Sequence, residues 1–572
     1  MKQMSFTAVK NLIWRCRFLM VVLVFSLPAI TDLLKPGYFS MHDDLQILRL
    51  QQLDKCVHDF QLPCRWVPDP GFGYGYPMFN YYPPLPYFLA EVFYIAGFNL
   101  FWSIKIVFIL SIILSGLFMF ALISELLSPL AGVVAAVFYV WAPYHSVDVY
   151  VRGAMNEAWG LTFFPLILLF AYKLAQGNKN KFLIPGLALS FSALLLSHNV
   201  MTLIFGPILA VWSLFWLCYF KNFRQITKMA IAGLWGIGLA AFFFLPVTLE
   251  SRLVHVETMT IGYFNYLAHF ADINQLFFSR FWGFGGSTWG PGDDMAFPVG
   301  HFHWVIALIA LVAGIFLIIK SIQGKIKLRQ WPISIFWICF FVFIGMLYIF
   351  LTHSRAVWFW DHLPLLYFAQ FPWRLLAVPA LAFSILAGVV IYLIRSWKVS
   401  WLIAAALLVG VVVWNYPFFK IQKQVTVTTE EKFSGSLWEL QVTGGIFDYL
   451  PKTASRPPGG PAFIYPQFIE GNGGILDFHR GTNWLKFTAR VSTDQAVLQL
   501  PLFEFPRTII TIDGRKTAFG HDADLGRLEI QLAGGEHRVE AKIEDTPIRT
   551  LSNIVSLISL GLLIKYIHAF KS

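Results

Sequence analysis

The chain is poor in charged residues: Asp, Glu, Lys and Arg make up only 13% of its 572 residues. Soluble globular proteins carry about 25%, so this composition excludes an ordinary soluble domain. Hydrophobic residues make up 57% of the chain, and the mean hydropathy is +0.62. The apolar residues fall in runs of about 17 to 24, long enough to cross a bilayer core of roughly 30 Å. The sequence therefore predicts a multi-spanning membrane protein.

The sequence also lacks internal repeats and low-complexity tracts, and cysteine is scarce, with five in all. Cys16, Cys218 and Cys339 lie inside apolar runs, where a free cysteine behaves as a small hydrophobic residue. Cys56 and Cys64 share one segment between two apolar runs. In an oxidising compartment such a pair can form a disulfide, and the sequence leaves open whether it does.

Twelve apolar runs are predicted to span the membrane. The first follows a basic N-terminus, from Lys2 to Arg17, and no small-residue cleavage site comes after it. We therefore expect an uncleaved first helix rather than a signal peptide. The predicted spans cover residues 18–30, 100–123, 128–144, 157–175, 182–198, 200–220, 229–249, 302–320, 331–351, 374–395, 399–416 and 551–570.

Basic residues in the short loops set the orientation of these spans. With the N-terminus inside, the loops that contain Lys179, Arg224, Lys325 and Lys398 all lie on the inner side. We therefore expect both termini to be cytoplasmic. The net charge of +11 follows from this topology, so it does not indicate a nucleic acid partner.

The same orientation places four longer segments outside the membrane, at residues 31–99, 145–156, 250–301 and 417–550. Residues 83–98 are apolar but are interrupted by prolines and Glu91. This pattern predicts a helix that lies in the membrane interface rather than a full span.

Residues 425–548 change from long apolar runs to alternation of apolar and polar residues, as in 484–491 and 527–532. Alternation with a period of two predicts β-strands. Asp513-Gly514 and Gly534-Gly535 separate such runs and predict hairpin turns. This part of the chain is therefore expected to be an extracytoplasmic antiparallel β-sandwich.

The predicted fold class is an α-helical polytopic membrane protein, with about twelve transmembrane helices and a C-terminal β-sandwich domain. The predicted domains are a transmembrane domain at 1–424 with outer loops at 31–99 and 250–301, the sandwich at 425–548, and a C-terminal transmembrane helix at 549–572.

The first candidate site is His42-Asp43-Asp44 in the first outer segment. Adjacent carboxylates near a membrane can supply a general base or hold a divalent cation. Ser40-Met41-His42-Asp43 also fits the [ST]-x-x-[DE] capping box of a helix that would run to about residue 60. The two roles can divide between Asp43 and Asp44, and the sequence leaves both interpretations open.

Further candidates lie at the outer ends of predicted helices. Arg152 can clamp a phosphate with two hydrogen bonds, or it can pair with Glu157 and close its loop. Arg374 opens an apolar helix from outside, where it can bind an anionic headgroup or only extend to the interface. His198 stands in a tight turn, where a lone histidine is more often structural. His301 and His303 are spaced as metal ligands, but no third ligand motif is near them in the sequence.

Several motifs resemble a family of bacterial membrane proteins labelled "6-pyruvoyl-tetrahydropterin synthase-related". They are His42-Asp43-Asp44, the Gly/Tyr/Pro-rich segment 73–83, Tyr150-Val-Arg-Gly153, Gln370-Phe-Pro-Trp-Arg374 and Asp448-Tyr449-Leu450-Pro451. We discount the pterin chemistry in that label, because it needs a zinc site of three histidines in a soluble barrel and the sequence contains no such arrangement.

An Asp-Asp motif in the first outer loop, a dozen helices and an outer C-terminal domain resemble the GT-C class of glycosyltransferases. This resemblance implies inverting transfer of a sugar from a polyprenyl-phosphate-linked donor to a glycan, lipid or protein acceptor. The reaction would take place on the outer side of the bacterial cytoplasmic (inner) membrane. Asp43 or Asp44 would deprotonate the acceptor hydroxyl, and Arg152 and Arg374 would receive the departing phosphate.

The class varies in its use of a divalent cation such as Mg²⁺ or Mn²⁺, so the metal stays open here. The predicted aromatic platforms for sugar rings include Trp282 and Trp289. The predicted substrate-binding residues are His42, Arg49, Tyr74, Tyr76, Arg152, Glu157, His198 and Arg374.

Two other functional classes fit parts of the pattern. A transporter or flippase for a lipid-linked saccharide also has about twelve helices, but transporters place ionisable residues near the membrane midplane. The charged residues of this chain lie mainly in outer loops and at helix ends. A non-catalytic envelope scaffold would tolerate the loss of Asp43 and Asp44.

Overall fold

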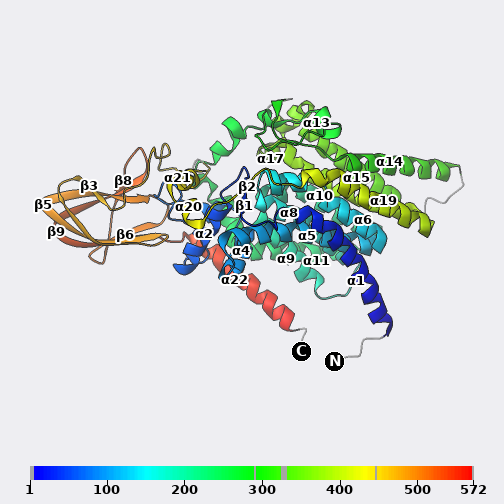
Figure 1. The fold of residues 1–572 in the computed structure, drawn as a ribbon. Coiled ribbons are helices and arrows are strands. Elements are labelled where there is room, and N and C mark those ends of the chain that lie inside the picture. The colour runs from blue at the N-terminus through cyan, green and yellow to red at the C-terminus, as the bar shows by residue number, and fades with distance from the viewer. Residues whose placement is uncertain (1–5, 289–291, 324–331, 445–447, 570–572) are drawn as a thin grey trace. The chain divides into compact units, whose positions relative to one another are not determined.

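The computed structural model describes residues 6–288, 292–323, 332–444 and 448–569 (Figure 1). The chain divides into two compact units. The first unit consists of Met1–Asp43, Lys105–Gly236 and Tyr263–Thr426, and the second of Asp44–Ile104, Ile237–Gly262 and Val427–Ser572. The C-terminal β-rich region therefore groups with most of the first outer segment.

Within the described residues, eight helices are long and apolar enough to cross a membrane, and two bent helix pairs raise the number to ten if each pair is one span. The other two predicted spans form shorter apolar helices, at Cys16–Ile30 and Leu183–Ser197. Every predicted run thus coincides with a helix, which confirms the multi-pass prediction. The helices at these runs are α1 (Phe6–Ser26), α5 (Leu100–Leu126), α6 (Pro129–Val140), α7 (Pro143–Ser146) with the π-helical turn η2 (Val147–Val151), α8 (Met155–Ala175), α9 (Leu183–Ser197), α10 (Asn199–Tyr219), α11 (Gln225–Leu239), α12 (Ala241–Leu249), α14 (His301–Ile322), α15 (Pro332–Thr352), α18 (Ala377–Leu393), α19 (Trp397–Asn415) and α22 (Pro547–His568).

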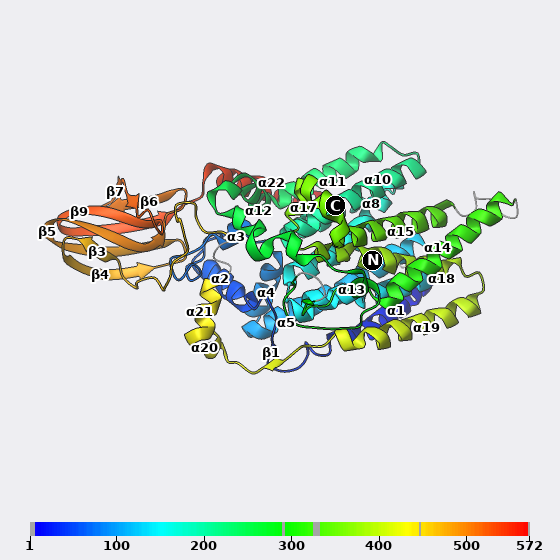
Figure 2. The same ribbon diagram turned by 90° about the horizontal axis from the view of Figure 1, so that it is seen from above.

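Helix α18 forms the centre of the first unit, where it packs against α6, α14 and α15. In an apolar stretch of 18 residues within Pro372–Leu393, 89% of the residues are buried. A Cβ on Gly388 would come within 2.9 Å of the Ala131 carbonyl oxygen, so glycine allows α18 and α6 to approach closely. Helices α8 and α10 lie side by side in both views (Figures 1 and 2). The rings of Phe164 and Phe205 stack between them, with their centroids 4.3 Å apart.

The helices of the second unit include α2 (Gln46–His58), whose Ile47, Leu50 and Leu53 are buried at helical spacing. The predicted capping box is wrong, because the N-cap residue of α2 is Leu45 and no side chain caps this helix. Helix α4 (Leu85–Ile95) forms within residues 83–98, where an interfacial helix is predicted, and it packs against α2. The other helices are α3 (Met78–Tyr81), α20 (Thr429–Lys432) and α21 (Gly435–Thr443).

Cys56 and Cys64 form a disulfide, with their Cα atoms 5.5 Å apart. The bridge joins the last turn of α2 to the loop that follows it, which settles the alternative left open by the sequence. Cys16, Cys218 and Cys339 are free.

The strands of the second unit form one antiparallel sheet in the order β3-β5-β9-β6-β7, with β4 paired to β5 and β8 to β9. Alternate residues of the long central strands are buried, as the period of two predicts. The strands of this sheet begin only at residue 467, and the described residues between 426 and 466 form helices and loops. Their bounds are β3 (Gln467–Glu470), β4 (Gly473–Arg480), β5 (Trp484–Phe503), β6 (Thr508–Ile512), β7 (Arg515–Thr517), β8 (Gly520–His521) and β9 (Arg527–Ile543).

One of the two predicted hairpin turns is confirmed. Asp513 and Gly514 join β6 to β7 with positive φ angles of 52° and 78°, as a tight two-residue hairpin requires. Gly534 and Gly535 instead lie inside β9, where the register with β5 shifts. That prediction is wrong, because a glycine pair serves a bulge as readily as a turn.

Candidate functional site

Four charged side chains meet in the first unit. Nη1 of Arg152 lies 2.7 Å from Oδ1 of Asp148 and 2.8 Å from Oε2 of Glu157. Nε of Arg374 lies 3.4 Å from the same Glu157 oxygen. Both carboxylates are completely buried. Two arginines that come from distant parts of the sequence thus converge on one carboxylate, and we call these four residues the charged cluster.

Local backbone structure brings these side chains together. Asp148 lies in η2, four residues before Arg152, so both face the same side of the turn. Glu157 lies in the first turn of α8, where the helix dipole favours a carboxylate. Arg374 lies in a 3₁₀ turn that leads into α18, and its Nη1 donates to Ala369 O at 2.9 Å and to Gln370 Oε1 at 2.7 Å.

Aromatic side chains enclose the two guanidinium groups. Arg152 lies 4.5 Å above the ring of Trp373, and Arg374 lies 4.7 Å above the ring of Phe371. The Trp373 ring is fixed because its Nε1 donates to Ser287 Oγ at 3.1 Å. Cation–π contacts of this kind strengthen when water is excluded.

The charges within the cluster balance only when both carboxylates are ionised. A buried charge without a partner is strongly unfavourable, so each arginine depends on its acid. Burial alone would lower the pKa of Arg152, but Glu157, Tyr144 and Asp148 outweigh it and raise that pKa above its ordinary value. The Tyr144 hydroxyl adds a hydrogen bond to Glu157.

His198 stands beside this cluster and also has a structural role. Its Nδ1 accepts a hydrogen bond from the backbone N–H of Met201 at 3.1 Å, which caps α10. Because Nδ1 accepts this bond, the ring carries its proton on Nε2. That atom lies 3.9 Å from Oε2 of Glu157.

The motif at residues 42–43 is hydrogen-bonded to the Arg152 segment. The backbone N–H of Asp43 donates to Arg152 O at 2.9 Å, and that of His42 donates to Val151 O at 3.1 Å. Gly153 has a φ of 64°, and a Cβ there would overlap the Met41 side chain. Only glycine therefore allows this pairing, which brings two of the predicted motifs together.

His42 and Asp44 are held by different contacts. Burial lowers the pKa of His42, whose Nε2 lies 2.8 Å from Phe284 O in the first unit. In the second unit, Lys432 Nζ donates to Asp44 Oδ2 at 2.6 Å, and the Lys432 side chain is buried. Asp44 is thus held in an ion pair, whereas the backbone of Asp43 pairs with the Arg152 segment.

Three of the predicted substrate-binding residues are packed within the second unit. Arg49 is buried, with its guanidinium 4.2 Å above the Tyr82 ring. Tyr74 and Tyr76 are each only 4% exposed, and they pack against Phe503 and Tyr449. The structure therefore does not present these two tyrosine rings to a sugar, because neighbouring rings cover them.

Two predicted tryptophan platforms and the motif at residues 448–451 remain to be placed. In the first unit, Trp282 stacks on Phe418, with the ring centroids 4.5 Å apart. Trp289 lies outside the described residues. In the second unit, the backbone N–H of Tyr449 donates to Tyr76 Oη at 3.1 Å. The Tyr449 ring stacks on the Tyr81 ring, with the centroids 5.4 Å apart. The motif at 448–451 thus packs against the aromatic-rich segment of the first outer loop.

No group of three or more His, Cys, Asp and Glu residues in the described part of the chain is arranged to hold a metal ion. The spacing of His301 and His303 has a structural explanation, because their Nε2 atoms lie 3.2 Å from Phe278 O and 2.9 Å from Phe138 O. Dependence on Mg²⁺ or Mn²⁺ stays a prediction.

Sequence reasoning missed Asp148 and Tyr144. The segment 145–156 is predicted as an outer loop, whereas the helix continues through η2 to Val151. The spacing of four between Asp148 and Arg152 is the signal that was available, since it is typical of a helical ion pair.

No protein-family model matches the chain. An uncharacterized protein of Lactococcus lactis subsp. cremoris (strain MG1363) is 26% identical over 260 residues, which are 42% of this chain and 41% of that protein. The resemblance to the pterin-labelled family therefore stays a prediction.

Three solved structures have a similar fold. ArnT of Cupriavidus metallidurans bound to undecaprenyl phosphate is 14% identical, with a TM-score of 0.38 over 70% of this chain and 63% of that one. The Archaeoglobus fulgidus oligosaccharyltransferase in the apo form is 10% identical, with a TM-score of 0.43 over 78% and 61% of the two chains. The arabinofuranosyltransferase AftD from Mycobacteria is 14% identical, with a TM-score of 0.33 over 70% and 27%.

This chain spans less than two thirds of the length of each of these four proteins. All three TM-scores lie below 0.5, so the function proposed below rests on the residues of this chain.

Proposed function

We propose that the chain is a membrane glycosyltransferase that moves a sugar from a polyprenyl-phosphate-linked donor to an acceptor outside the cytoplasmic membrane. The observation that carries the proposal is the convergence of Arg152 and Arg374 on Glu157, with Asp43 hydrogen-bonded to the Arg152 segment. Buried ionisable residues at the ends of apolar helices are costly, and they generally mark a functional site.

In this proposal the two arginines receive the phosphate of the lipid carrier. Both ion pairs of Arg152 use Nη1, so its Nε and Nη2 are the donors that a phosphate oxygen would take. Asp148 and Glu157 hold the guanidinium groups in place before the substrate binds. Donors oriented in advance, in a site with little water, stabilise the charge that develops on a departing phosphate.

We assign the general base to Asp43 rather than to Asp44. Asp44 is engaged with Lys432, whereas the backbone of Asp43 is bonded to Arg152. The Asp43 carboxylate would take the proton of the acceptor hydroxyl, and the hydroxyl oxygen would form a bond to the anomeric carbon of the donor. The bond from that carbon to the phosphate oxygen would break, and its electron pair would leave with the phosphate.

The test is mass spectrometry of envelope lipids and glycans from a strain that lacks the gene. A glycosyltransferase predicts that a polyprenyl-phosphate-linked sugar accumulates and that one glycan, lipid or protein loses that sugar. Adding EDTA to membranes that carry out the transfer then determines whether turnover needs a divalent cation.

The same deletion strain separates the transferase from the flippase and the scaffold. Loss of a flippase would leave the lipid-linked saccharide on the inner leaflet, protected from enzymes added outside spheroplasts. Loss of a scaffold would change neither the lipid-linked pool nor the glycan composition. Either result would contradict the transferase proposal.

A further inference from the structure

The second unit contains a cavity of about 560 Å³, within the range of about 300–1,000 Å³ that is usual for small-molecule sites. Four separate parts of this unit form its wall. They are the disulfide-closed loop around residues 59–66, Pro77 and Asn80 at α3, the end of the sheet at residues 483–484, 505, 507 and 542–545, and the first turn of α22.

Arg549 is one of four residues in this wall that have a buried side-chain donor without a hydrogen-bond partner among the described residues; the others are Arg65, Trp66 and Asn80. The Arg549 side chain is only 2% exposed, and its Nε donates to Glu250 Oε2 at 2.7 Å. Thr546 bonds the other oxygen of Glu250, and the Arg549 guanidinium lies 4.8 Å above the Phe505 ring. Among the described residues, none accepts a hydrogen bond from Nη2 of Arg549. A buried donor without an acceptor is costly, so the Arg549 guanidinium has hydrogen-bonding capacity that the described residues do not use.

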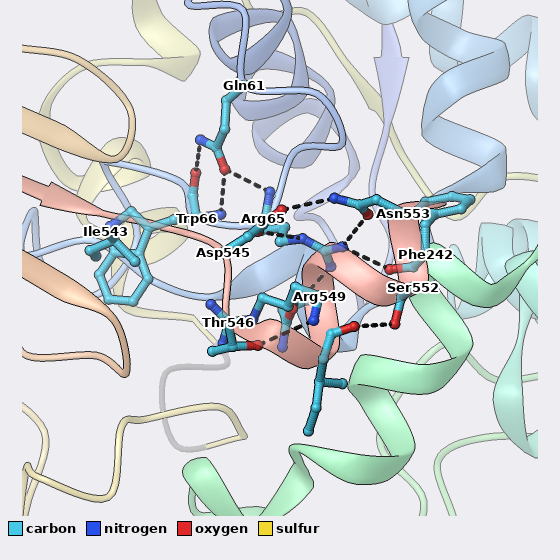
Figure 3. Close-up of polar contacts among 12 residues, drawn as sticks. Gln61, Arg65, Trp66, Phe242, Ile543, Asp545, Thr546, Arg549, Ser552 and Asn553 are labelled. Carbon is cyan, nitrogen blue, oxygen red and sulfur yellow. Dashed lines mark hydrogen bonds and ion pairs between the residues drawn. The ribbon is translucent and has the colours of Figure 1, made fainter. Parts of the chain in front are cut away.

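Arg65, in the same wall, takes part in several polar contacts (Figure 3). Its Nη2 donates to Phe242 O at 3.0 Å and to Asn553 Oδ1 at 2.7 Å, and its Nε lies 3.1 Å from Asp545 Oδ1. Asn553 in turn donates to Asp545 Oδ2 at 2.8 Å. This network links the loop to α22, so the wall is held in a defined arrangement.

Aromatic side chains also line the cavity, and one of them, Phe60, is exposed to solvent. Phe60 is 88% exposed although it is a large apolar side chain. The disulfide between Cys56 and Cys64 closes the short loop that carries it. Trp484 also lines the cavity, and its Nε1 donates to Asp59.

The chemistry of the lining favours a hydroxyl-rich ligand. The polar lining contains the amides Gln61, Asn80 and Asn483, the acids Asp59, Glu544 and Asp545, and the bases Arg65, Arg507, Lys542 and Arg549. Mixed donors and acceptors suit vicinal hydroxyls, and an exposed aromatic ring offers a face against which the apolar side of a pyranose can pack. Charges of both signs argue against a site for a bare anion.

We propose that this cavity is a saccharide-binding site, with Arg549 donating to a sugar oxygen and Phe60 stacking on a ring. The site does not depend on the transferase assigned above. A protein that lacked transfer activity would still bind the saccharide here.

The test measures binding of defined tri- to hexasaccharides to the purified full chain in detergent. Three sets of probes are used: neutral hexose chains, N-acetylhexosamine chains and uronic acid chains. Binding to at least one set is expected. Phe60→Ala should weaken it about two- to tenfold, and Arg549→Lys, which keeps the charge but removes Nη2, about tenfold or more.

Tyr465→Ala is the matched control, because Tyr465 is an exposed aromatic residue of the same unit that does not line the cavity. It should leave the affinity unchanged. If Arg549→Lys fails to fold, Phe60→Ala still decides, since Phe60 is exposed. Failure of all three probe sets to bind would overturn the proposal, and so would equal binding by wild type and Phe60→Ala.

Discussion

Nη1 of Arg152 lies 2.8 Å from Oε2 of Glu157, and this ion pair is the centre of the charged cluster. Glu157→Gln would leave Arg152 and Arg374 facing one another without the shared carboxylate. Removing one partner of a buried ion pair costs about 3–5 kcal/mol, so we expect a clear drop in the unfolding temperature of the purified protein. Glu470→Gln, at an exposed position of β3, should leave that temperature unchanged. Equal unfolding temperatures for wild type and Glu157→Gln would contradict the pairing.

Glu91 on α4 predicts a pH-dependent stability. Burial raises the pKa of Glu91 to about 7 from 4.5, and the Asp54 carboxylate adds to this effect. Because the folded-state pKa is the higher one, the protonated group favours folding fully below pH 4.5, and this contribution is lost as the pH rises through about 7.

Glu91→Gln should therefore raise the free energy of unfolding at pH 8.5, by up to about 3 kcal/mol, and should change little at pH 4.5. Chemical denaturation at the two pH values measures the difference. An equal effect of the substitution at both values would show that Glu91 is not the titrating group.

The disulfide predicts resistance to alkylation and a contribution to stability. Closing a loop of this size stabilises by about 2–3 kcal/mol in the chain-entropy account. The double variant Cys56→Ser and Cys64→Ser should unfold at a lower temperature, whereas Cys218→Ser, at a free cysteine, should not. Two alkylated cysteines at positions 56 and 64 under non-reducing conditions would reject the bridge.

The topology predicts which engineered cysteines are labelled from outside the cell. In a chain without Cys16, Cys218 and Cys339, Lys398→Cys should react with an impermeant maleimide only after permeabilisation, because this start of α19 is basic and is therefore predicted to be cytoplasmic. Lys516→Cys, in strand β7 of the C-terminal sheet, should react in intact cells. Both positions are exposed. Labelling of Lys398→Cys from outside would invert the orientation.

Hydropathy alone was enough to locate the long apolar helices, because every predicted run coincides with a helix or with a bent helix pair. The alternation at residues 484–491 likewise became the first part of β5. The Gly534-Gly535 turn failed because the signal is local, whereas the pairing of β9 with β5 through a register shift depends on the partner strand.

For the site, the sequence singled out Arg152, Glu157, His198 and Arg374, because charged residues beside apolar runs stand out, and the structure places these four side chains together. It could not indicate that both arginines share one carboxylate, since that contact joins residues far apart in the chain. It also could not separate Asp43 from Asp44, because the buried Lys432 that pairs with Asp44 has no distinguishing pattern around it.

The central claim is that Asp43 is the catalytic base of a sugar transfer, and a matched pair of variants tests it most directly. Asp43→Asn and Asp44→Asn are each expressed in the deletion strain, and the accumulated polyprenyl-phosphate-linked sugar is quantified by mass spectrometry at equal protein levels. We predict that Asp44→Asn restores the wild-type level, whereas Asp43→Asn leaves the sugar at the level of the deletion strain. Restoration of the wild-type level by Asp43→Asn would contradict the account.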